Sequence, residues 1–331
     1  MATIGKDASS ASPSPSPLAR PHTLTRIIAM MNQKGGVGKT TTTVNLAAGV
    51  AQLGRSTLLI DLDPQAHATL HLGIADAGAN RPDAASPDAP SVYDVLHDPS
   101  LAPSAVVASR PLLGVLPAVT DLAAAETELA GASDRQQRLS AAIELLKRRF
   151  EFIFIDCPPS LGLLTLNALA AAREVIVPMQ AHFLALQGVG KLLETVHLVG
   201  RGVNPRLRVS GVVLCMHEET TKHAREVVAD IENFFKQSRE QDVPWRGARV
   251  HRPPVRRNIK LAECPSFGKT IFEYAPGCPG AQDYGALAAE LVRDWDALLA
   301  RRTGDTGAAG AAPTSTAPIV LSGVEPARVA S

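Results

Sequence analysis

The sequence predicts an α/β fold in which a mostly parallel, twisted sheet carries helices on both faces. Two observations lead to this prediction: short, nearly continuous apolar runs recur along the chain, and segments of helical length lie between most of them. Apolar runs of this kind are typical of strands that are covered on both faces. Because parallel neighbours must be joined by crossovers, the alternation indicates right-handed connections onto one sheet.

The apolar runs define the expected strands in chain order. They lie at residues 26–31, 56–61, 112–118, 150–156, 174–179 and 208–216. Helices are expected in the segments 39–53, 134–149, 162–172, 184–200, 222–237 and 281–300. Gly54 follows the first helical segment, at the position where a glycine commonly ends a helix.

Both ends of the chain differ in composition from the segment between them. Residues 1–23 are rich in Ser, Pro and Ala, and residues 302–331 in Ala, Gly, Thr and Pro. Such segments cannot bury enough apolar surface to offset their ordering entropy, so we expect two disordered tails around one domain at 24–301. Residues 74–91 have a similar composition and are expected to form a mobile surface loop.

The overall composition excludes several classes of protein. Lys and Arg number 33 against 32 Asp and Glu, so any binding to nucleic acid must depend on a local cluster of charge. The four cysteines are scattered, which implies neither a zinc site nor a disulfide framework. No secretory signal and no apolar run of about 18 residues is present in the sequence. We therefore expect a cytoplasmic protein that does not associate with a membrane.

A glycine-rich turn joins the first expected strand to the first expected helix, in the stretch MNQKGGVGKTTTT. Its glycines let backbone N–H groups converge on a phosphate, and the positive end of the helix faces the same point. In such a P-loop, Lys39 would meet the β- and γ-phosphates of ATP, and the Thr40 hydroxyl would ligate Mg²⁺. The loop residues predicted to bind ATP are Lys34, Gly35, Gly36, Val37, Gly38, Lys39, Thr40 and Thr41. The turn thus predicts the P-loop NTPase fold.

Carboxylates stand at the ends of two expected strands. Asp61 ends one strand, with Asp63 two residues further on, and Asp156 ends another. Prolines follow both strands and prevent them from continuing. An aspartate at such a position commonly holds the Mg²⁺ of a P-loop protein, and Asp156 is predicted to do so.

The glycine-rich turn departs from the strict P-loop pattern. Gln33 takes the place of the first glycine, and an additional lysine, Lys34, precedes the others. The resulting KGGVGKT resembles the deviant Walker A motif of the ParA/MinD superfamily. Three more stretches are similar to segments of the ParA/Soj partition ATPases, namely DLDPQAHATLHLGI, FIFIDCPPSLGLLTLNAL and AECPSFGKTIFEYAPGCPGAQDYGALAAEL. The resemblance covers residues 25–300.

The resemblance implies a role for each matching residue. Lys34 would cross a dimer interface to the partner's nucleotide, and Asp63 would position the attacking water, so that Lys34, Lys39 and Asp63 are the expected catalytic residues. Asp61 would assist the metal site beside Thr40 and Asp156, and Met216 would lie near the adenine. ATP carries about four negative charges, of which Mg²⁺ and Lys39 offset about three. A lysine from a second protomer would supply the missing charge and couple hydrolysis to dimerisation.

A second cluster of interest is the basic segment, defined as residues 246–260. It carries Arg246, Arg249, Arg252, Arg256, Arg257 and Lys260, and no acid stands between Asp242 and Glu263. Such a cluster can bind DNA phosphates without sequence preference, although a merely solvated basic edge is the alternative. The residues predicted to contact DNA are Lys222, Arg225, Arg252, Arg256, Arg257 and Lys260.

The resemblance implies a slow, Mg²⁺-dependent ATPase that forms a homodimer on binding ATP. It would bind non-specific double-stranded DNA on the nucleoid and be stimulated by a ParB-like centromere-binding protein. Its cargo could be a chromosome, a plasmid or a protein cluster. The alternatives are a metabolic P-loop ligase, an iron–sulfur reductase and a MinD-like membrane positioner, although the C-terminal tail shows no basic amphipathic helix.

Several positions depart from the family pattern. Ala66 and His67 replace the usual Gly-Asn, which is expected to alter the flexibility of that segment. His182 stands where a glutamate is common, Thr220 where an arginine is common and Arg256 where a proline is common.

Overall fold

The computed structural model describes residues 24–74, 89–181, 185–218 and 222–303. Both expected tails, apart from the last turn of a helix that ends at Thr303, and most of the loop expected at 74–91 lie outside these residues. Contacts divide the chain into one unit that ends at Arg293 and another that begins at Asp294. The sheet and the sites described below belong to the first unit.

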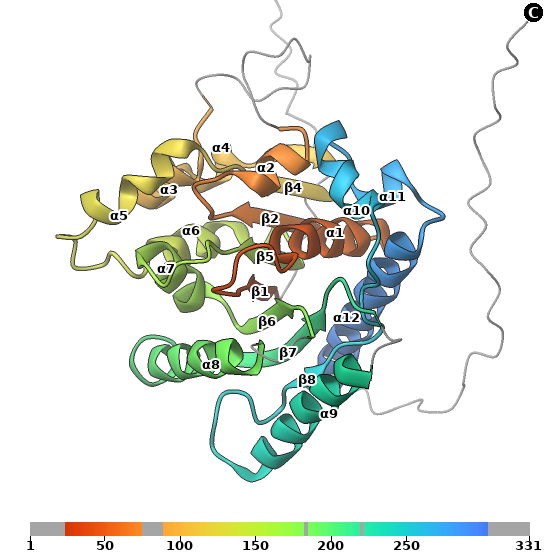
Figure 1. Ribbon diagram of the computed structural model, residues 1–331. Coiled ribbons are helices and arrows are strands. Elements are labelled where there is room, and N and C mark those ends of the chain that lie inside the picture. Colours follow the sequence, from red (N-terminus) through yellow and green to blue (C-terminus); the bar gives the residue numbers. More distant parts are fainter. Residues whose placement is uncertain (1–23, 75–88, 182–184, 219–221, 304–331) are drawn as a thin grey trace, which may run out of the picture. The chain divides into compact units, whose positions relative to one another are not determined.

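Eight strands in the described residues form one sheet, in the order β3-β4-β2-β5-β1-β6-β7-β8 (Figure 1). The strands are β1 (Arg26–Met30), β2 (Thr57–Asp61), β3 (Val107–Arg110), β4 (Leu113–Leu116), β5 (Phe152–Asp156), β6 (Glu174–Met179), β7 (Arg208–Leu214) and β8 (Arg249–Val250). Every neighbouring pair is parallel except β3 and β4. The carboxyl ends of the parallel strands therefore meet at one edge of the sheet.

Long helices alternate with the strands, as the sequence predicts. They are α1 (Lys39–Gln52), α6 (Arg138–Leu146), α7 (Leu163–Ala171), α8 (Ala185–Gly202), α9 (Lys222–Gln237) and α12 (Pro279–Thr303). Short helices of one or two turns lie between them, namely α2 (His67–His71), α3 (Val92–His97), α4 (Ala102–Ala105), α5 (Ala125–Glu128), α10 (Lys260–Glu263) and α11 (Ile271–Tyr274). Within the described residues, no helix is both long enough and apolar enough to cross a bilayer.

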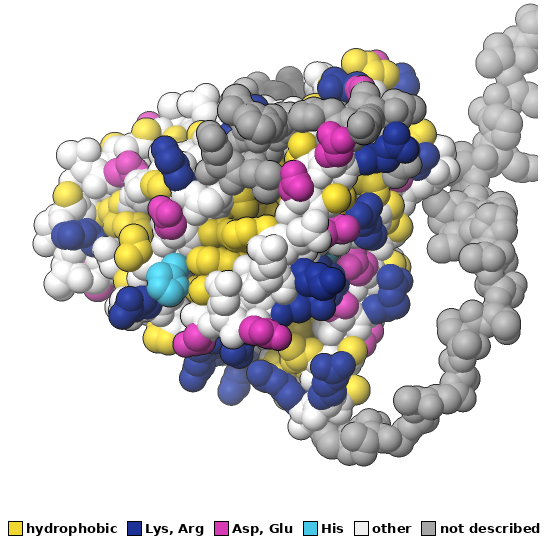
Figure 2. Space-filling view, turned by 60° about the horizontal axis from the view of Figure 1, so that its bottom comes forward, with side chains coloured by type: hydrophobic (Ala, Val, Ile, Leu, Met, Phe, Trp, Pro, Cys, Tyr) yellow, Lys and Arg dark blue, Asp and Glu magenta, His cyan; other side chains and the backbone are white. Residues whose placement is uncertain are grey.

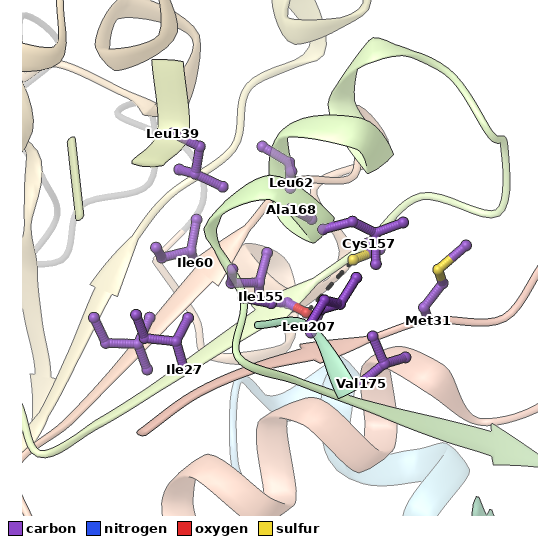
Figure 3. Close-up of a cluster of buried hydrophobic side chains, with 14 of the residues drawn as sticks. Ile27, Met31, Ile60, Leu62, Leu139, Ile155, Cys157, Ala168, Val175 and Leu207 are labelled. Carbon is purple, nitrogen blue, oxygen red and sulfur yellow. Dashed lines mark hydrogen bonds between the residues drawn. The ribbon is translucent and has the colours of Figure 1, made fainter. Parts of the chain in front are cut away.

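Successive side chains of a strand point to opposite faces of the sheet, so each apolar strand has apolar side chains on both faces. Helices cover both faces. Ile27 and Met31 of the first strand region join a large buried cluster with side chains of α6, α7 and α8. Figure 3 shows them in this cluster with Leu139 of α6 and Ala168 of α7. Ile28 is equally buried but lies outside that cluster. On its side of the sheet, Arg26 donates a hydrogen bond to the carbonyl of Leu291 in α12 (2.7 Å). The apolar strands are thus buried from both sides.

Every strand and long helix expected from the sequence is present, and the α/β fold class is confirmed. The elements that the sequence did not indicate are β3, β8 and the short helices. β3 is a partly exposed edge strand of four residues, and β8 has only two. Elements this short carry too few residues for a recognisable period.

Candidate nucleotide-binding site

The glycine-rich loop connects the carboxyl end of β1 to the first turn of α1. Gly36 and Gly38 have φ angles of 71° and 90°, in the left-handed region that favours glycine. A Cβ atom on Gly38 would also lie 3.3 Å from the Cβ of Cys215, which follows β7. Glycine at position 38 therefore serves both the turn and the close approach of the neighbouring chain.

The threonines at the start of α1 attach the loop to the neighbouring strands. Thr40 Oγ1 donates to Asp156 Oδ2 and Thr43 Oγ1 to Asp156 Oδ1, both at 2.7 Å. The hydroxyl of Thr42 lies 2.9 Å from that of Tyr284. The threonine run, which is a mediocre helix former, is thus used for hydroxyl contacts. The contacts of Thr42 and Thr43 were not predictable from the P-loop pattern.

Two buried aspartates lie side by side at the carboxyl ends of β2 and β5, where Asp61 is the register partner of Asp156. Burial, and next the charge of Asp156, raise the pKa of Asp61 to about 7. Burial also raises the pKa of Asp156, although Lys39 opposes the shift. Asp61 is held in place by the backbone N–H and the hydroxyl of Thr69, both at 2.8 Å. These two carboxylates have little positive charge near them, and the hydroxyl of Thr40 lies beside Asp156. This set of oxygen donors fits Mg²⁺.

Lys39 and Asp63 face each other across the loop. Lys39 Nζ lies 3.8 Å from Asp63 Oδ2, and both side chains are largely buried. The second oxygen of Asp63 accepts a hydrogen bond from the backbone N–H of Gln65 (3.0 Å). The carboxylate is therefore fixed on one side by the backbone and faces the ammonium group of Lys39 on the other.

These residues surround one cavity of ≈ 350 Å³. It is lined by Lys34, Gly35, Gly36, Gly38, Lys39, Thr40, Asp63, Gln65, His67 and Pro159. Lys34 lies on the exposed rim, and its backbone N–H donates to Asn32 Oδ1 (2.9 Å). The structure thus places Lys34, Lys39, Thr40 and Asp63 around the same cavity. Gln65, His67 and Pro159 also line the cavity, although no motif in the sequence indicates a role for them there.

Three of the residues predicted to bind ATP do not line the cavity but lie near it. Val37 is buried beneath the loop, and Thr41 begins α1 beside Thr40. Met216 has a φ of 49°, and its sulfur lies 3.3 Å from Gln180 Nε2, which also approaches the carbonyl of Gly36 at 3.3 Å. Met216 is therefore connected to the loop through Gln180.

Some of the residues that depart from the family pattern lie in the described part of the chain, and their conformation can be stated. Ala66 has a φ of 52°, so an alanine occupies a left-handed conformation at the position where the similar segments carry glycine. His67 follows it as the first residue of α2. His182 and Thr220 lie outside the described residues.

The basic segment lies apart from the nucleotide cavity, around β8 and α10, and most of its cations are paired. The ion pairs are Arg249–Glu290 (2.7 Å), Arg252–Glu232 (2.6 Å), Arg256–Asp283 (2.7 Å), Arg257–Glu218 (2.5 Å) and Lys260–Glu263 (2.8 Å). Arg225 is exposed on α9, and the side chain of Lys222 lies outside the described part of the chain. Acids from α9 and α12, which are distant in the sequence, thus offset much of the charge that the segment shows by itself.

Comparison with known proteins identifies the family. The AAA domain family matches residues 25–209. The chain is 42% identical over 273 residues to the chromosome partitioning protein ParA of Myxococcus xanthus, covering 82% of this chain and 89% of that protein. It is 41% identical over 268 residues to the sporulation initiation inhibitor protein Soj of Bacillus subtilis, covering 81% and 98%.

Solved structures agree on the fold. A cobyrinic acid a,c-diamide synthase from Mycobacterium smegmatis, with bound ADP and magnesium, matches with a TM-score of 0.65 and 35% identity over 82% of this chain and 96% of that one. The cell division ATPase MinD of Pyrococcus furiosus matches with a TM-score of 0.61 and 23% identity, over 82% and 99%. Sequence motifs, site geometry and relatives together show that the chain belongs to the ParA/Soj family of chromosome-partitioning ATPases.

Proposed function

We propose that this protein is an ATP-dependent switch that dimerises on Mg²⁺-ATP, binds DNA without sequence preference and partitions a DNA cargo with a ParB-like partner. The observation that carries the proposal is the position of Lys34. It lies on the exposed rim of a cavity that already contains Lys39, Thr40 and Asp63. A second protomer facing this rim could receive the ammonium group of Lys34 in its own site.

The residues of one protomer supply most of the hydrolytic machinery. Backbone N–H groups of the loop and Lys39 would hold the phosphates, while Thr40, Asp61 and Asp156 would hold Mg²⁺, which adds positive charge beside the transferred phosphoryl group. Binding of a phosphate to Lys39 would weaken its contact with Asp63. The free carboxylate oxygen of Asp63 could then accept a hydrogen bond from the attacking water.

Lys34 would supply the remaining positive charge from the opposite protomer. Negative charge on the oxygens of the phosphoryl group is redistributed in the transition state. A preorganised cation stabilises this charge most strongly where water is excluded. A closed dimer provides that exclusion, so turnover would require two ATP-loaded protomers. Because its catalytic carboxylate lies in a loop, the enzyme would be slow until its partner protein acts.

The basic segment and the neighbouring helix α9 are the proposed contacts for nucleoid DNA. The candidates remain Lys222, Arg225, Arg252, Arg256, Arg257 and Lys260. A guanidinium carries five N–H donors, so an arginine that is paired to one carboxylate can still contact a phosphate. Dimerisation would double this surface and thereby make DNA binding respond to ATP.

Sedimentation and turnover of Lys34→Ala test the proposal. We expect this variant to bind ATP normally but to stay monomeric with a non-hydrolysable ATP analogue and to lose hydrolysis. Lys191→Ala, at an exposed lysine on α8, serves as the matched control and should behave as the wild type. If Lys34→Ala dimerises and hydrolyses ATP like the control, the proposal is refuted.

An amide-forming ligase is the second candidate, because a solved structure that is 35% identical carries the name of a diamide synthase. Such an enzyme would consume ATP only with a carboxylic acid acceptor and a source of ammonia. Turnover that depends on cobyrinic acid and ammonium, and is indifferent to DNA, would favour this candidate over partitioning.

A further inference from the structure

A second group of arginines, which shares Arg246 with the basic segment, lies at the edge of the sheet opposite to the nucleotide site. Arg208 begins β7, Arg201 lies in the last turn of α8, and Arg246 stands shortly before β8. These three arginines, which we call the arginine pocket, line one cavity of ≈ 430 Å³ together with His197 and Asp242. At the other end of β7, Cys215 approaches Gly38 of the phosphate loop.

The arginine pocket carries positive charge that the fold neutralises only in part. Within the described residues, Arg201, Arg208 and Arg246 form no ion pair. The guanidinium of Arg208 donates to the carbonyls of Pro205 (3.0 Å) and Leu207 (2.8 Å), which orients it without removing its charge. Asp242 lines the same pocket, so three guanidinium groups and one carboxylate leave a net positive charge around the hollow, and this charge attracts an anionic ligand.

The positive surface continues beyond the arginine pocket. Arg206 lines an adjoining cavity of ≈ 310 Å³, and Pro205 is shared by both cavities. All four arginines are exposed. Figure 2 brings forward the side of the molecule on which α8, α9 and β8 lie, and shows Lys and Arg side chains gathered along its lower edge. Guanidinium groups spread over two neighbouring hollows suit a repeating polyanion better than one small phosphate compound.

We propose that the arginine pocket, with Arg206, contacts the phosphate backbone of double-stranded DNA. This inference rests on the proposed function, to which it adds a second DNA surface. Arginine suits the task because its planar fork can donate two hydrogen bonds to one phosphate.

The position of the pocket has a consequence for regulation. β7 has seven residues, so its two ends lie about 20 Å apart. In a dimer joined at the nucleotide faces, the two arginine pockets would lie at the outer ends, one on each protomer. A single protomer therefore keeps a weak DNA contact without ATP, and the ATP dimer gains avidity by using two such contacts, on one DNA segment or on two.

Salt-dependent binding to a short DNA duplex tests the inference, with and without a non-hydrolysable ATP analogue. The test variant is Arg201→Gln/Arg246→Gln, which leaves the hydrogen bonds of Arg208 intact. The control Lys269→Gln/Arg293→Gln removes two charges from exposed positions outside both basic groups. We expect the slope of log affinity against log salt to decrease by about 1 for each arginine removed from the pocket, in both nucleotide states.

Additional variants and assays distinguish DNA binding from loss of the fold and from binding of a small polyphosphate. Arg201→Lys/Arg246→Lys should restore the slope, and DNA-free ATP hydrolysis should be unchanged in all variants, which shows that the fold is intact. A test variant with the slope of the control overturns the inference while leaving the proposed function standing. Loss of binding to labelled tripolyphosphate with an unchanged DNA slope also overturns it, since the pocket would then hold a small polyphosphate. A wild type that binds no DNA defeats the DNA part of the proposed function as well.

Discussion

The phosphate loop and the basic segment are both short runs of sequence with conspicuous charge, yet the fold treats their charges in opposite ways. Around the loop, Asp61 and Asp156 are buried against each other, and burial raises both pKa values. Around the basic segment, each of five cations already has a carboxylate within 2.8 Å. The first region has excess negative charge that a metal ion would balance, whereas most of the positive charge of the second is already balanced by carboxylates.

This difference follows from where the partner residues lie in the sequence. A P-loop is built from consecutive residues, so its geometry is contained in one stretch. The basic segment contains no acid, but Glu232 comes from α9 and Glu290 from α12. A run of basic residues therefore predicts a positive surface only if the fold brings no acids to it.

The largest effect is expected where the phosphate loop loses its own cation. Lys39→Ala removes the positive charge that faces Asp63 and Asp156, and with it the proposed phosphate contact. We expect turnover to decrease by about 10²–10³-fold or more, with a matching loss of ATP binding. Titration with a fluorescent ATP analogue measures this, and Lys191→Ala is again the control. ATP binding equal to that of the control would show that the loop does not hold the phosphates as described.

Removing the carboxylate of Asp63, which we propose positions the attacking water, should separate ATP binding from hydrolysis. Asp63→Asn keeps the size of the side chain and its contact with Gln65 but cannot act as a base. We expect ATP-dependent dimers to persist while hydrolysis decreases by about 10²-fold. Single-turnover assays with excess enzyme provide the measurement. Undiminished hydrolysis would assign the positioning of water to another group.

The sequence predicts well those features that depend on neighbouring residues, and poorly those that depend on the fold. All six apolar strands and the phosphate loop are recognisable because period and motif are local. The bonds of Thr69 to Asp61, and of Asn45 to the backbone N–H of Ile271 (2.9 Å), join residues whose proximity no pattern indicates. The arginine pocket is likewise assembled from two separate stretches.

A more moderate effect should follow when an acid is removed from the basic segment. Glu232→Gln frees Arg252, and Glu218→Gln frees Arg257; all four side chains are at least half exposed, so the fold should tolerate both changes. We expect each substitution to raise DNA affinity and to steepen its salt dependence by up to about 1. Asp121→Asn, at an exposed position outside the basic segment and the arginine pocket, is the control. Unchanged DNA binding would place these arginines outside the DNA surface.

The smallest effect concerns the stability that the basic segment gains from its ion pairs with acidic residues of other elements. Burial alone would raise the pKa of Glu290, but the hydrogen bond and charge of His251, followed by Arg249, outweigh it and lower this pKa from 4.5 to about 2. The folded protein therefore binds this proton less readily than the unfolded chain. The stabilisation is present above about pH 4.5 and is lost as the pH falls toward 2, and it amounts to on the order of 1–2 kcal/mol.

Urea unfolding at pH 3 and pH 6 tests this assignment. Glu290→Gln should lower the free energy of unfolding at pH 6, and by less than half as much at pH 3, where the unfolded chain is already protonated and the folded protein only in part. The exposed Glu232→Gln should show little pH dependence. An equal loss of free energy at both pH values in Glu290→Gln would contradict the assignment.

Mixing two inactive variants tests most directly whether Lys34 acts on the partner's nucleotide. Lys34→Ala and Asp63→Asn are each expected to be inactive alone. In a mixed dimer, the site of the Lys34→Ala protomer retains Asp63 and receives Lys34 from its partner, so one of the two sites is complete. Hydrolysis by the mixture should then rise well above that of either variant, to at most half of the wild-type rate, because only one of the two sites in each mixed dimer is complete. If the mixture stays as inactive as its components while mixed dimers form, Lys34 acts within its own protomer and the composite site is refuted.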